Sequence, residues 1–330
     1  MMRTTAWLAM GCLLSVGAVG CGDDGPSGTD GGMAEGGPPA NCPHSMDVPQ
    51  PDGFMGACCY RKSNAMSLAA PELRIAGFSV STPAALGNVV VAGLLAGALD
   101  EERFNWLLRV TGADADGEVT ITTGLGERAV AGSDVTFAFV NNGAPMPGPA
   151  DRWNPIVITG TLTGETISAP RLDEIFTLPI FDDDRTTLVV ELPLSNLELV
   201  EISLSEDRSC VGTRRASSYD TADGHLTAFM PLVEADLALL KVGCDAMGMN
   251  CTMDTTLCGL IIGQSGVQGS SCADFERSMW DASVQPDSLC GMAGCERNPA
   301  GATTVCDPAT VCNAWFVDAA FAAQGVEIAD

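Results

Sequence analysis

The chain has 330 residues, of which 46% are hydrophobic, and its formal net charge at pH 7 is −26. This hydrophobic content is enough for a globular core in one large or two modest domains. The acidity argues against nucleic acid as a partner, because phosphate groups repel a strongly negative protein.

The first 21 residues read as a secretory signal peptide. Arg3 supplies a positive charge, residues 6–19 are almost wholly apolar, and Ala18, Val19 and Gly20 provide small or short side chains before Cys21. A charged start, an apolar run and a small-residue cleavage point occur in this order in exported proteins. An uncleaved membrane helix is the alternative. Glycines, however, lower the hydrophobicity of this apolar run, whose length is already near the lower limit of about 17 residues for spanning a bilayer.

This segment resembles the lipobox signal peptide of bacterial lipoproteins, in which a cysteine is diacylated and becomes the mature N-terminus. The resemblance implies removal of residues 1–20 as the signal peptide, lipidation of Cys21 and acylation with a fatty acid such as palmitate. Ala18 stands where leucine is usual, so an ordinary signal peptidase could also accept the segment.

A lipid anchor and flexible linker are predicted over residues 21–41. After Cys21 this stretch is mostly Gly, Pro and acidic residues, with no aromatic or branched aliphatic side chain to bury. Such a composition remains a flexible coil, and twenty Gly-rich residues span about 25 Å on average.

Residues 42–243 are predicted to form a β-rich domain that begins with a cysteine-containing lead. Between residues 73 and 204, apolar residues alternate with polar ones, which predicts half-buried antiparallel strands. The fold class is therefore mainly β: an antiparallel sandwich or an open barrel with one or two helices, followed by a disulfide-rich C-terminal segment. Proline inside a strand favours an edge position, which concerns Pro179 and Pro193. The positions predicted to face inward are Leu73, Ile75, Trp106, Leu108, Val110, Val119, Ile121, Val135, Phe137, Phe139, Ile156, Ile158, Phe176, Leu178, Ile180, Leu188, Val190, Leu192, Val200, Ile202 and Leu204.

The first predicted helix covers residues 84–99 and follows the Thr82-Pro83 pair, a good N-cap and first helical position. Residues 75–99 carry no charge, so a membrane span is the alternative. Pro83 and Asn88 shorten the apolar run below the usual requirement of about 20 residues. A buried core helix, with glycines that allow close packing, is favoured.

The second predicted helix begins at Pro231 and ends at Gly243. Val233, Leu237 and Leu240 are predicted to face inward, because they recur at helical spacing. Glycine is a common residue just past a helix end.

Cysteine usage agrees with export. Of the 14 cysteines, Cys12 lies in the signal peptide and Cys21 is assigned to lipid, which leaves an even twelve. An even set in an exported chain predicts up to six disulfides, whose connectivity the sequence leaves open. A bridge from Cys58 or Cys59 to Cys210 and a strained bridge between Cys58 and Cys59 are both considered. The twelve are Cys42, Cys58, Cys59, Cys210, Cys244, Cys251, Cys258, Cys272, Cys290, Cys295, Cys306 and Cys312.

Residues 244–330 form the predicted Cys-rich segment. It is expected to be a disulfide-stapled insertion before a returning strand or short helix at residues 314–328, and a separate C-terminal knob is the alternative. A zinc site is not indicated, because no C-x2-C pair occurs and the chain's two histidines, His44 and His225, are far apart in sequence.

Metal candidates are weak. Acidic loops could hold Ca²⁺ loosely, but none completes an EF-hand, and solvated turn residues are the favoured interpretation. The acidic candidates are Asp114, Asp116 and Glu118, then Asp182, Asp183 and Asp184, and finally Asp220 and Asp223. A copper site of soft donors would use Met247, Met249, Cys251 and Met253 with Cys244 and Cys258.

No catalytic motif is complete. Ser265 misses the nucleophile-elbow pattern by one residue, His225 is predicted to be solvated just past a hairpin turn, and His44 lies in a loop. A sugar-stacking platform would need exposed aromatic side chains among Trp106, Trp153, Tyr219, Trp280 and Trp315. Of these, Trp106 is predicted to be buried and Trp153 to lie on a loop.

The layout as a whole resembles envelope lipoproteins of the myxobacteria. The shared features are the lipobox, the acidic tether, Cys58-Cys59 followed by Tyr60-Arg61, the run at residues 104–109 and the late cysteine cluster. The resemblance brings no activity with it and implies a place in the outer membrane or at the cell surface, facing the periplasm or the exterior.

We therefore expect a lipid-anchored envelope protein that acts by binding or as a structural surface component. Its contact with the membrane would be the N-terminal lipid, its partners an envelope protein or a polysaccharide, and its cofactors none beyond weak Ca²⁺. The alternatives are an extracytoplasmic hydrolase with an unlocated site and a Ca²⁺- or Cu-binding envelope protein.

Overall fold

The fold was analysed in a computed structural model. It describes residues 69–87, 89–131, 136–140, 153–173, 175–181, 188–205, 208, 210–215, 218–221, 223–240, 255–263 and 271–329. All of them belong to one compact unit, Pro38–Asp330. The signal peptide, Cys21, the linker and the cysteines at positions 42, 58 and 59 lie outside the described residues.

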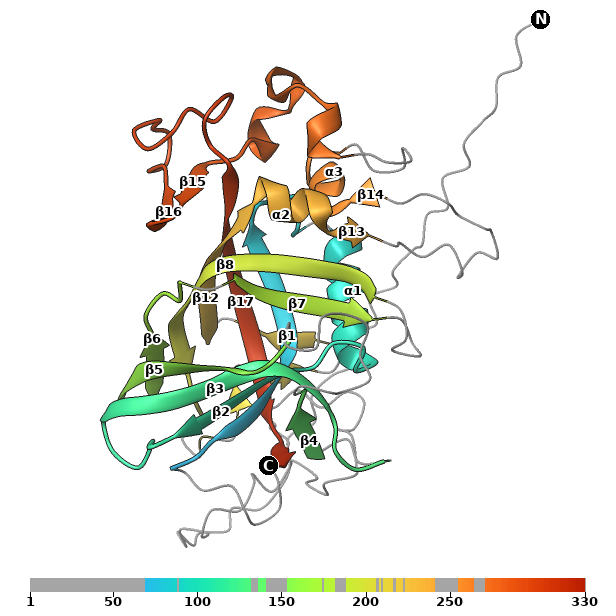
Figure 1. The fold of residues 1–330 in the computed structure, drawn as a ribbon. Helices are drawn as coiled ribbons and strands as arrows, with labels where there is room; N and C mark the ends of the chain where they lie inside the picture. The colour runs from blue at the N-terminus through green and yellow to red at the C-terminus, as the bar shows by residue number, and fades with distance from the viewer. Residues whose placement is uncertain are drawn as a thin grey trace, which may run out of the picture. The chain divides into compact units, whose positions relative to one another are not determined.

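Antiparallel strands form a closed barrel, which confirms the predicted mainly β class (Figure 1). Each barrel strand pairs with the next one along the chain, and the last strand pairs with the first, so the sheet closes on itself. Closure removes the free strand edges that an open sheet would expose. The barrel strands are β1 (Glu72–Thr82), β2 (Trp106–Thr111), β3 (Gly117–Arg128), β5 (Ile156–Thr163), β6 (Thr166–Ala169), β8 (Leu188–Ser203), β12 (Gly224–Pro231) and β17 (Ala314–Gly325).

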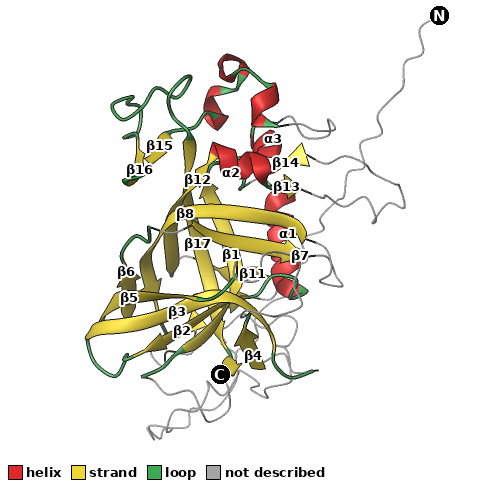
Figure 2. Ribbon diagram, viewed as in Figure 1, coloured by secondary structure: helices red, strands yellow, loops and turns green. Residues whose placement is uncertain are grey.

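Shorter elements lie in the connections between barrel strands, and β18 follows the last barrel strand (Figure 2). The helices are α1 (Val89–Asp100), α2 (Leu232–Leu237) and α3 (Leu257–Ile261), with 3₁₀ turns η2 (Cys272–Asp274), η3 (Arg277–Met279) and η4 (Ala282–Val284). The strands are β4 (Thr136–Phe139), β7 (Ile175–Phe181), β9 (Cys210–Val211), β10 (Thr213–Arg215), β11 (Ser218–Asp220), β13 (Leu239–Leu240), β14 (Thr255–Thr256), β15 (Ser288–Gly291), β16 (Gly294–Arg297) and β18 (Glu327–Ala329).

Aromatic side chains fill the interior of the barrel around Trp106. Its ring centroid lies 5.3 Å from that of Phe176 and 6.5 Å from that of Phe321. Its indole Nε1 donates to the Thr123 hydroxyl at 2.6 Å, and that hydroxyl donates to the Leu107 carbonyl at 3.0 Å. An eight-stranded barrel is just wide enough for side chains to fill it, and here these aromatic side chains belong to one hydrophobic core.

Most of the positions predicted to face inward are buried. They are Leu73, Ile75, Trp106, Leu108, Val110, Val119, Ile121, Phe137, Phe139, Ile158, Phe176, Leu178, Ile180, Val190, Leu192, Ile202 and Leu204. Ile156 and Leu188 are half-buried, and Val135 lies outside the described residues. The alternation of apolar residues therefore identified the core correctly.

Val200 is an exception, since the predicted inward side chain is 38% exposed. Glu201 pairs with His225, yet Leu199 pairs with the next residue, Leu226, so β8 carries an extra residue at this point. A bulge of this kind shifts the alternation by one position, and Leu199 takes the buried place instead.

Both strand prolines lie where their strand pairs with only one described neighbouring strand, as predicted for edge positions. Pro179 lies in β7, and Pro193 lies in the part of β8 that pairs with β7 before pairing with β12 begins at Ser195. Proline lacks the N–H that a second neighbouring strand would need.

The helix α1 begins at Val89, after a turn, and not at residue 84 as predicted. It buries one side, which includes Leu95, Ala98 and Leu99. The expectation that its glycines allow close packing was wrong for Gly93, because a Cβ there would meet nothing within 4 Å. Among the described helices, none has the length and apolar character needed to cross a membrane.

The inward face predicted for the second helix was wrong. In α2 the exposed fractions of Val233 and Leu237 are 68% and 72%, whereas Leu232 and Ala235 are buried. The helix ends at Leu237, and Leu240 belongs to β13, so the expected apolar stripe over three turns does not form.

The Cys-rich segment is an insertion between β12 and β17. Pro231 and Ala314 are register partners in these neighbouring strands, so the intervening chain leaves and re-enters the barrel at one place. Residues 314–325 and 327–329 are strands, which decides between the strand and the short helix expected there. Within the insertion, Trp280 stacks on Trp315 of the barrel at 6.3 Å, and the two belong to one hydrophobic core.

Disulfides in the described part of this insertion join cysteines that are near neighbours in sequence. The pairs are Cys258–Cys272, Cys290–Cys295 and Cys306–Cys312. Cys210 is also disulfide-bonded. Cys58, Cys59, Cys244 and Cys251 lie outside the described residues. A bridge at Cys58 or Cys59 therefore stays a prediction.

We predict that the Trp106–Thr123 hydrogen bond stabilises the barrel. Thr123→Val should leave the buried indole N–H without an acceptor and lower the free energy of unfolding by about 1–3 kcal/mol. Denaturant unfolding of this variant, of Trp106→Phe and of the double variant forms a double-mutant cycle. A coupling energy near zero between the two positions would contradict the assignment.

Candidate functional site

Two groups of described side chains bring together atoms that could bind or react. The first, which we call the Asp236 cluster, consists of Asp236, Cys258 and Cys272. The second is the pair formed by His225 and Asp318.

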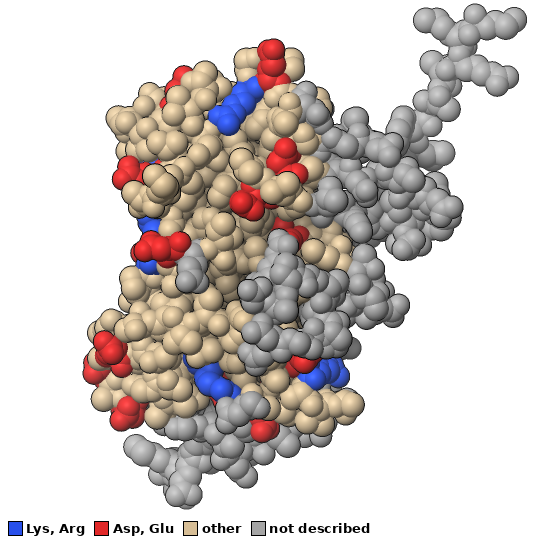
Figure 3. Space-filling view, viewed as in Figure 1, with Lys and Arg blue, Asp and Glu red and all other residues tan. Residues whose placement is uncertain are grey.

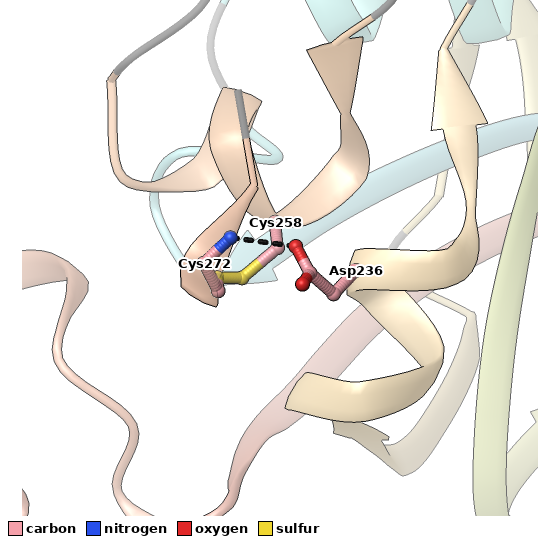
Figure 4. Close-up of side chains that lie close together, drawn as sticks. All are labelled: Asp236, Cys258 and Cys272. Atoms are coloured by element: carbon pink, nitrogen blue, oxygen red, sulfur yellow. Dashed lines mark hydrogen bonds between the residues drawn. A yellow bond between two sulfur atoms is a disulfide. The ribbon is translucent and has the colours of Figure 1, made fainter. Parts of the chain in front are cut away.

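Three elements of the insertion build the Asp236 cluster. Asp236 lies on α2, Cys258 on α3 and Cys272 at the start of η2. Their carboxylate and sulfur atoms lie within 4.8 Å of one another, and the carboxylate faces the disulfide (Figure 4). Cys258 is buried, whereas Asp236 and Cys272 are half-buried, so the cluster can be approached from one side.

Hydrogen bonds hold the Asp236 carboxylate in place. Its Oδ1 accepts from the backbone N–H of Cys272 at 2.6 Å and from the Thr256 hydroxyl at 3.2 Å. The same hydroxyl accepts from the N–H of Gly259 at 2.9 Å and so caps α3. Asp236 therefore links α2, α3 and η2 in a single network.

In this state the cluster is structural, because the two sulfurs are joined in a disulfide. A disulfide sulfur lacks the charge of the thiolate that serves as metal ligand and nucleophile. Sequence reasoning did not single out Asp236. It lies far along the chain from both cysteines, and no spacing rule connects them.

His225 and Asp318 face each other across neighbouring strands on the outer side of the barrel. The His225 Nε2 lies 2.9 Å from Asp318 Oδ1, and the two side chains are 38% and 36% exposed. In register, His225 stands opposite Glu201 of β8 and Ala320 of β17. The predicted position, on a strand just past a turn, is where the structure places it, but the carboxylate partner was not foreseen.

A carboxylate that orients an imidazole is one half of the arrangement that activates a nucleophile. Among the described residues, however, no hydroxyl group is hydrogen-bonded to His225. The pair also sits on the outside of a closed barrel, where water competes for every hydrogen bond. The pair therefore lacks an enclosed reaction site among the described residues.

The predicted calcium ligands that the structure describes do not form a metal-binding group. Asp114, Asp116 and Glu118 are exposed, and Asp116 Oδ1 accepts from the N–H of Gly164 at 2.9 Å, which joins two neighbouring turns. In the described ranges, the one group of three metal-binding side chains within ligand distance is the Asp236 cluster. Asp223 is exposed and the side chain of Asp220 is not described.

Several predicted residues lie outside the described ranges. They are His44, Asp182, Asp183, Asp184, Met247, Met249, Met253 and Ser265.

The tryptophans whose side chains are described are all buried. Trp106, Trp153, Trp280 and Trp315 are each at most 7% exposed. Trp153 lies at a turn outside the strands, as predicted, but its ring is buried edge-on against Phe181 at 5.6 Å and offers no exposed platform for sugar stacking. The side chain of Tyr219 is not described.

Two groups in the insertion have shifted pKa values. Hydrogen bonds from the backbone and side chain of Ser283 lower the pKa of Asp281. Burial lowers the pKa of Arg277, whose guanidinium donates to the Cys312 carbonyl. Both interactions organise the insertion and lie outside the two candidate groups.

Basic side chains lie beside acidic ones on the surface drawn in Figure 3. Ion pairs hold Arg109 with Glu72, Arg171 with Glu198, Arg208 with Glu165 and Arg297 with Asp287. Pairing of this kind leaves little positive charge to attract a polyanion.

Comparison with protein-family models, with curated proteins and with solved structures finds no match to this chain.

We predict that the hydrogen bonds accepted by the Asp236 carboxylate stabilise the folded protein. Asp236→Ala removes the acceptor for the Cys272 N–H and the Thr256 hydroxyl, and should lower the free energy of unfolding by about 1–3 kcal/mol. Asp236→Asn keeps an amide oxygen and should cost less than Asp236→Ala. Equal destabilisation of the two variants in denaturant unfolding would contradict this role.

Proposed function

We propose that this protein is a lipid-anchored component of the bacterial cell envelope that acts by binding or as a structural surface protein. The observation that carries the proposal is the N-terminal segment ending in Cys21, with its charged start, apolar run and small residues. The Gly-rich stretch that follows would hold the folded barrel about 25 Å from the membrane.

The described disulfides support the export that this proposal requires. Three pairs form among the described cysteines of the insertion, and disulfides persist mainly in oxidising compartments. The outer membrane or the cell surface, with the barrel facing the periplasm or the exterior, is the proposed location.

The packed aromatic core favours binding at the outer surface of the protein. Trp106, Phe176 and Phe321 contact one another around Trp106 within the hydrophobic core, where a ligand-binding barrel would need an opening. A partner protein or an envelope polysaccharide would then contact the exterior or the insertion.

We expect mass spectrometry of the mature N-terminus to find diacylglyceryl-Cys21 with a fatty acyl group. Cys21→Ala should release the protein from membranes into the soluble fraction, because a lipid anchor contributes about 0.8 kcal/mol for each buried CH₂. An unmodified N-terminus at another residue would contradict the anchor. As a control, Cys12→Ala should leave both the modification and the fractionation unchanged.

An extracytoplasmic hydrolase is the second candidate, and the His225–Asp318 pair is the observation that favours it. In that case His225→Ala should abolish hydrolysis of chromogenic ester, phosphate or peptide substrates. Stability should change by no more than about 1 kcal/mol, because the pair is solvent-exposed. Absence of hydrolysis by the unaltered protein across these substrates, or activity that survives His225→Ala, would remove this candidate.

A further inference from the structure

The Asp236 cluster contains a donor set that suits a zinc ion. It brings two cysteine sulfurs and a carboxylate within 4.8 Å, and Zn²⁺ binds thiolate sulfur and carboxylate oxygen. We propose that reduction of the Cys258–Cys272 disulfide converts the Asp236 cluster into a zinc site, with Cys258, Cys272 and Asp236 as ligands. This inference goes beyond the proposed function: the disulfide persists in an oxidising compartment, and the zinc form arises only where a dithiol reductant is supplied.

The reductant is an external dithiol. Its thiolate attacks the half-buried sulfur of Cys272, the buried sulfur of Cys258 leaves, and the second thiol of the reductant resolves the mixed disulfide. The reductant thus becomes a disulfide, while two electrons and two protons pass to Cys258 and Cys272. Zn²⁺ then displaces one proton from each thiol, forms two Zn–S bonds and one bond to Asp236, and keeps a position for water.

The donor atoms of the cluster determine which cation suits it. The mixed sulfur and oxygen donor set favours Zn²⁺ over Cu(I), which prefers sulfur alone.

Hydrogen bonds hold the cluster in addition to the disulfide. Leu239 of β13 pairs with Thr256 of β14, and the Thr256 hydroxyl donates to Asp236 at 3.2 Å. The Cys272 N–H binds the same carboxylate at 2.6 Å. Partners of this kind orient metal ligands in known sites and tune their affinity.

The backbone separation also suits a shared metal. The Cα atoms of Cys258 and Cys272 lie 5.5 Å apart. Two thiolates on a tetrahedral zinc ion lie about 3.8 Å apart, from Zn–S bonds of about 2.3 Å, so rotation of the side chains can open the required space.

The test is a zinc titration of the full mature chain, anaerobically, against a chromophoric chelator. A phosphine reductant opens the disulfides without competing for the metal as a dithiol would. We expect the reduced protein to bind one zinc ion more than C258S/C272S and to release about two protons for that ion. D236N should lower the affinity of this site at least about 10-fold, whereas C306S/C312S, which removes a neighbouring pair, should retain it.

Four results would overturn the proposal. The reduced protein could bind no more zinc than C258S/C272S, or D236N could bind as tightly as the unaltered chain. The oxidised protein could bind zinc at the cluster equally well, which would exclude the sulfurs as ligands. Loss of the strand signal in circular dichroism on reduction would show that the folded dithiol form does not exist. Circular dichroism of each variant checks that it is folded.

Discussion

The pairing of β1 with β17 is the constraint on which the rest of the structure depends. It runs from Leu73 opposite Gly325 to Thr82 opposite Asp318, and joins the start and the end of the described chain. Until β17 is in place, both β1 and β12 have a free edge, and the interior around Trp106 lacks Phe321. Because these contacts span almost the whole barrel in sequence, loop closure must be completed before they stabilise the fold.

The same pairing explains where the insertion sits. β17 must lie between β12 and β1, so the chain between Pro231 and Ala314 has to leave the barrel and return to it at neighbouring positions. Asn196 and Asn313 secure the returning hairpin of β15 and β16. Asn196 accepts from the Cys295 N–H at 2.8 Å, and Asn313 accepts from the Cys290 N–H at 2.7 Å. The backbone of Asn196 has φ of 51°, a conformation that asparagine adopts more readily than most residues.

Local patterns in the sequence predicted most of the fold but little of the candidate site. Alternation placed the predicted core residues of β2, β3 and β7 correctly, because they lie on the face that packs into the main core. It missed Leu107, which is buried on the other face of β2 in a second cluster. It failed at Val200, where a bulge depends on the neighbouring strand, and at α2, where the helix is too short for its apolar stripe. The sugar-stacking role considered for Trp153 failed for a similar reason, since Phe181 of another strand packs against its ring. Barrel closure and the meeting of Asp236 with two cysteines are long-range contacts, and no local pattern encodes them.

Three disulfide pairs in the described part of the insertion stabilise it internally. The largest of them, between Cys258 and Cys272, closes a loop worth about 3 kcal/mol in chain entropy. Other interactions attach the insertion to the barrel: the stack of Trp280 on Trp315, the asparagine hydrogen bonds and a core shared with Leu257 and Ile261. The proposed switch at the Asp236 cluster would therefore act within the insertion, and the pairing of β12 with β17 that closes the barrel would not be part of it.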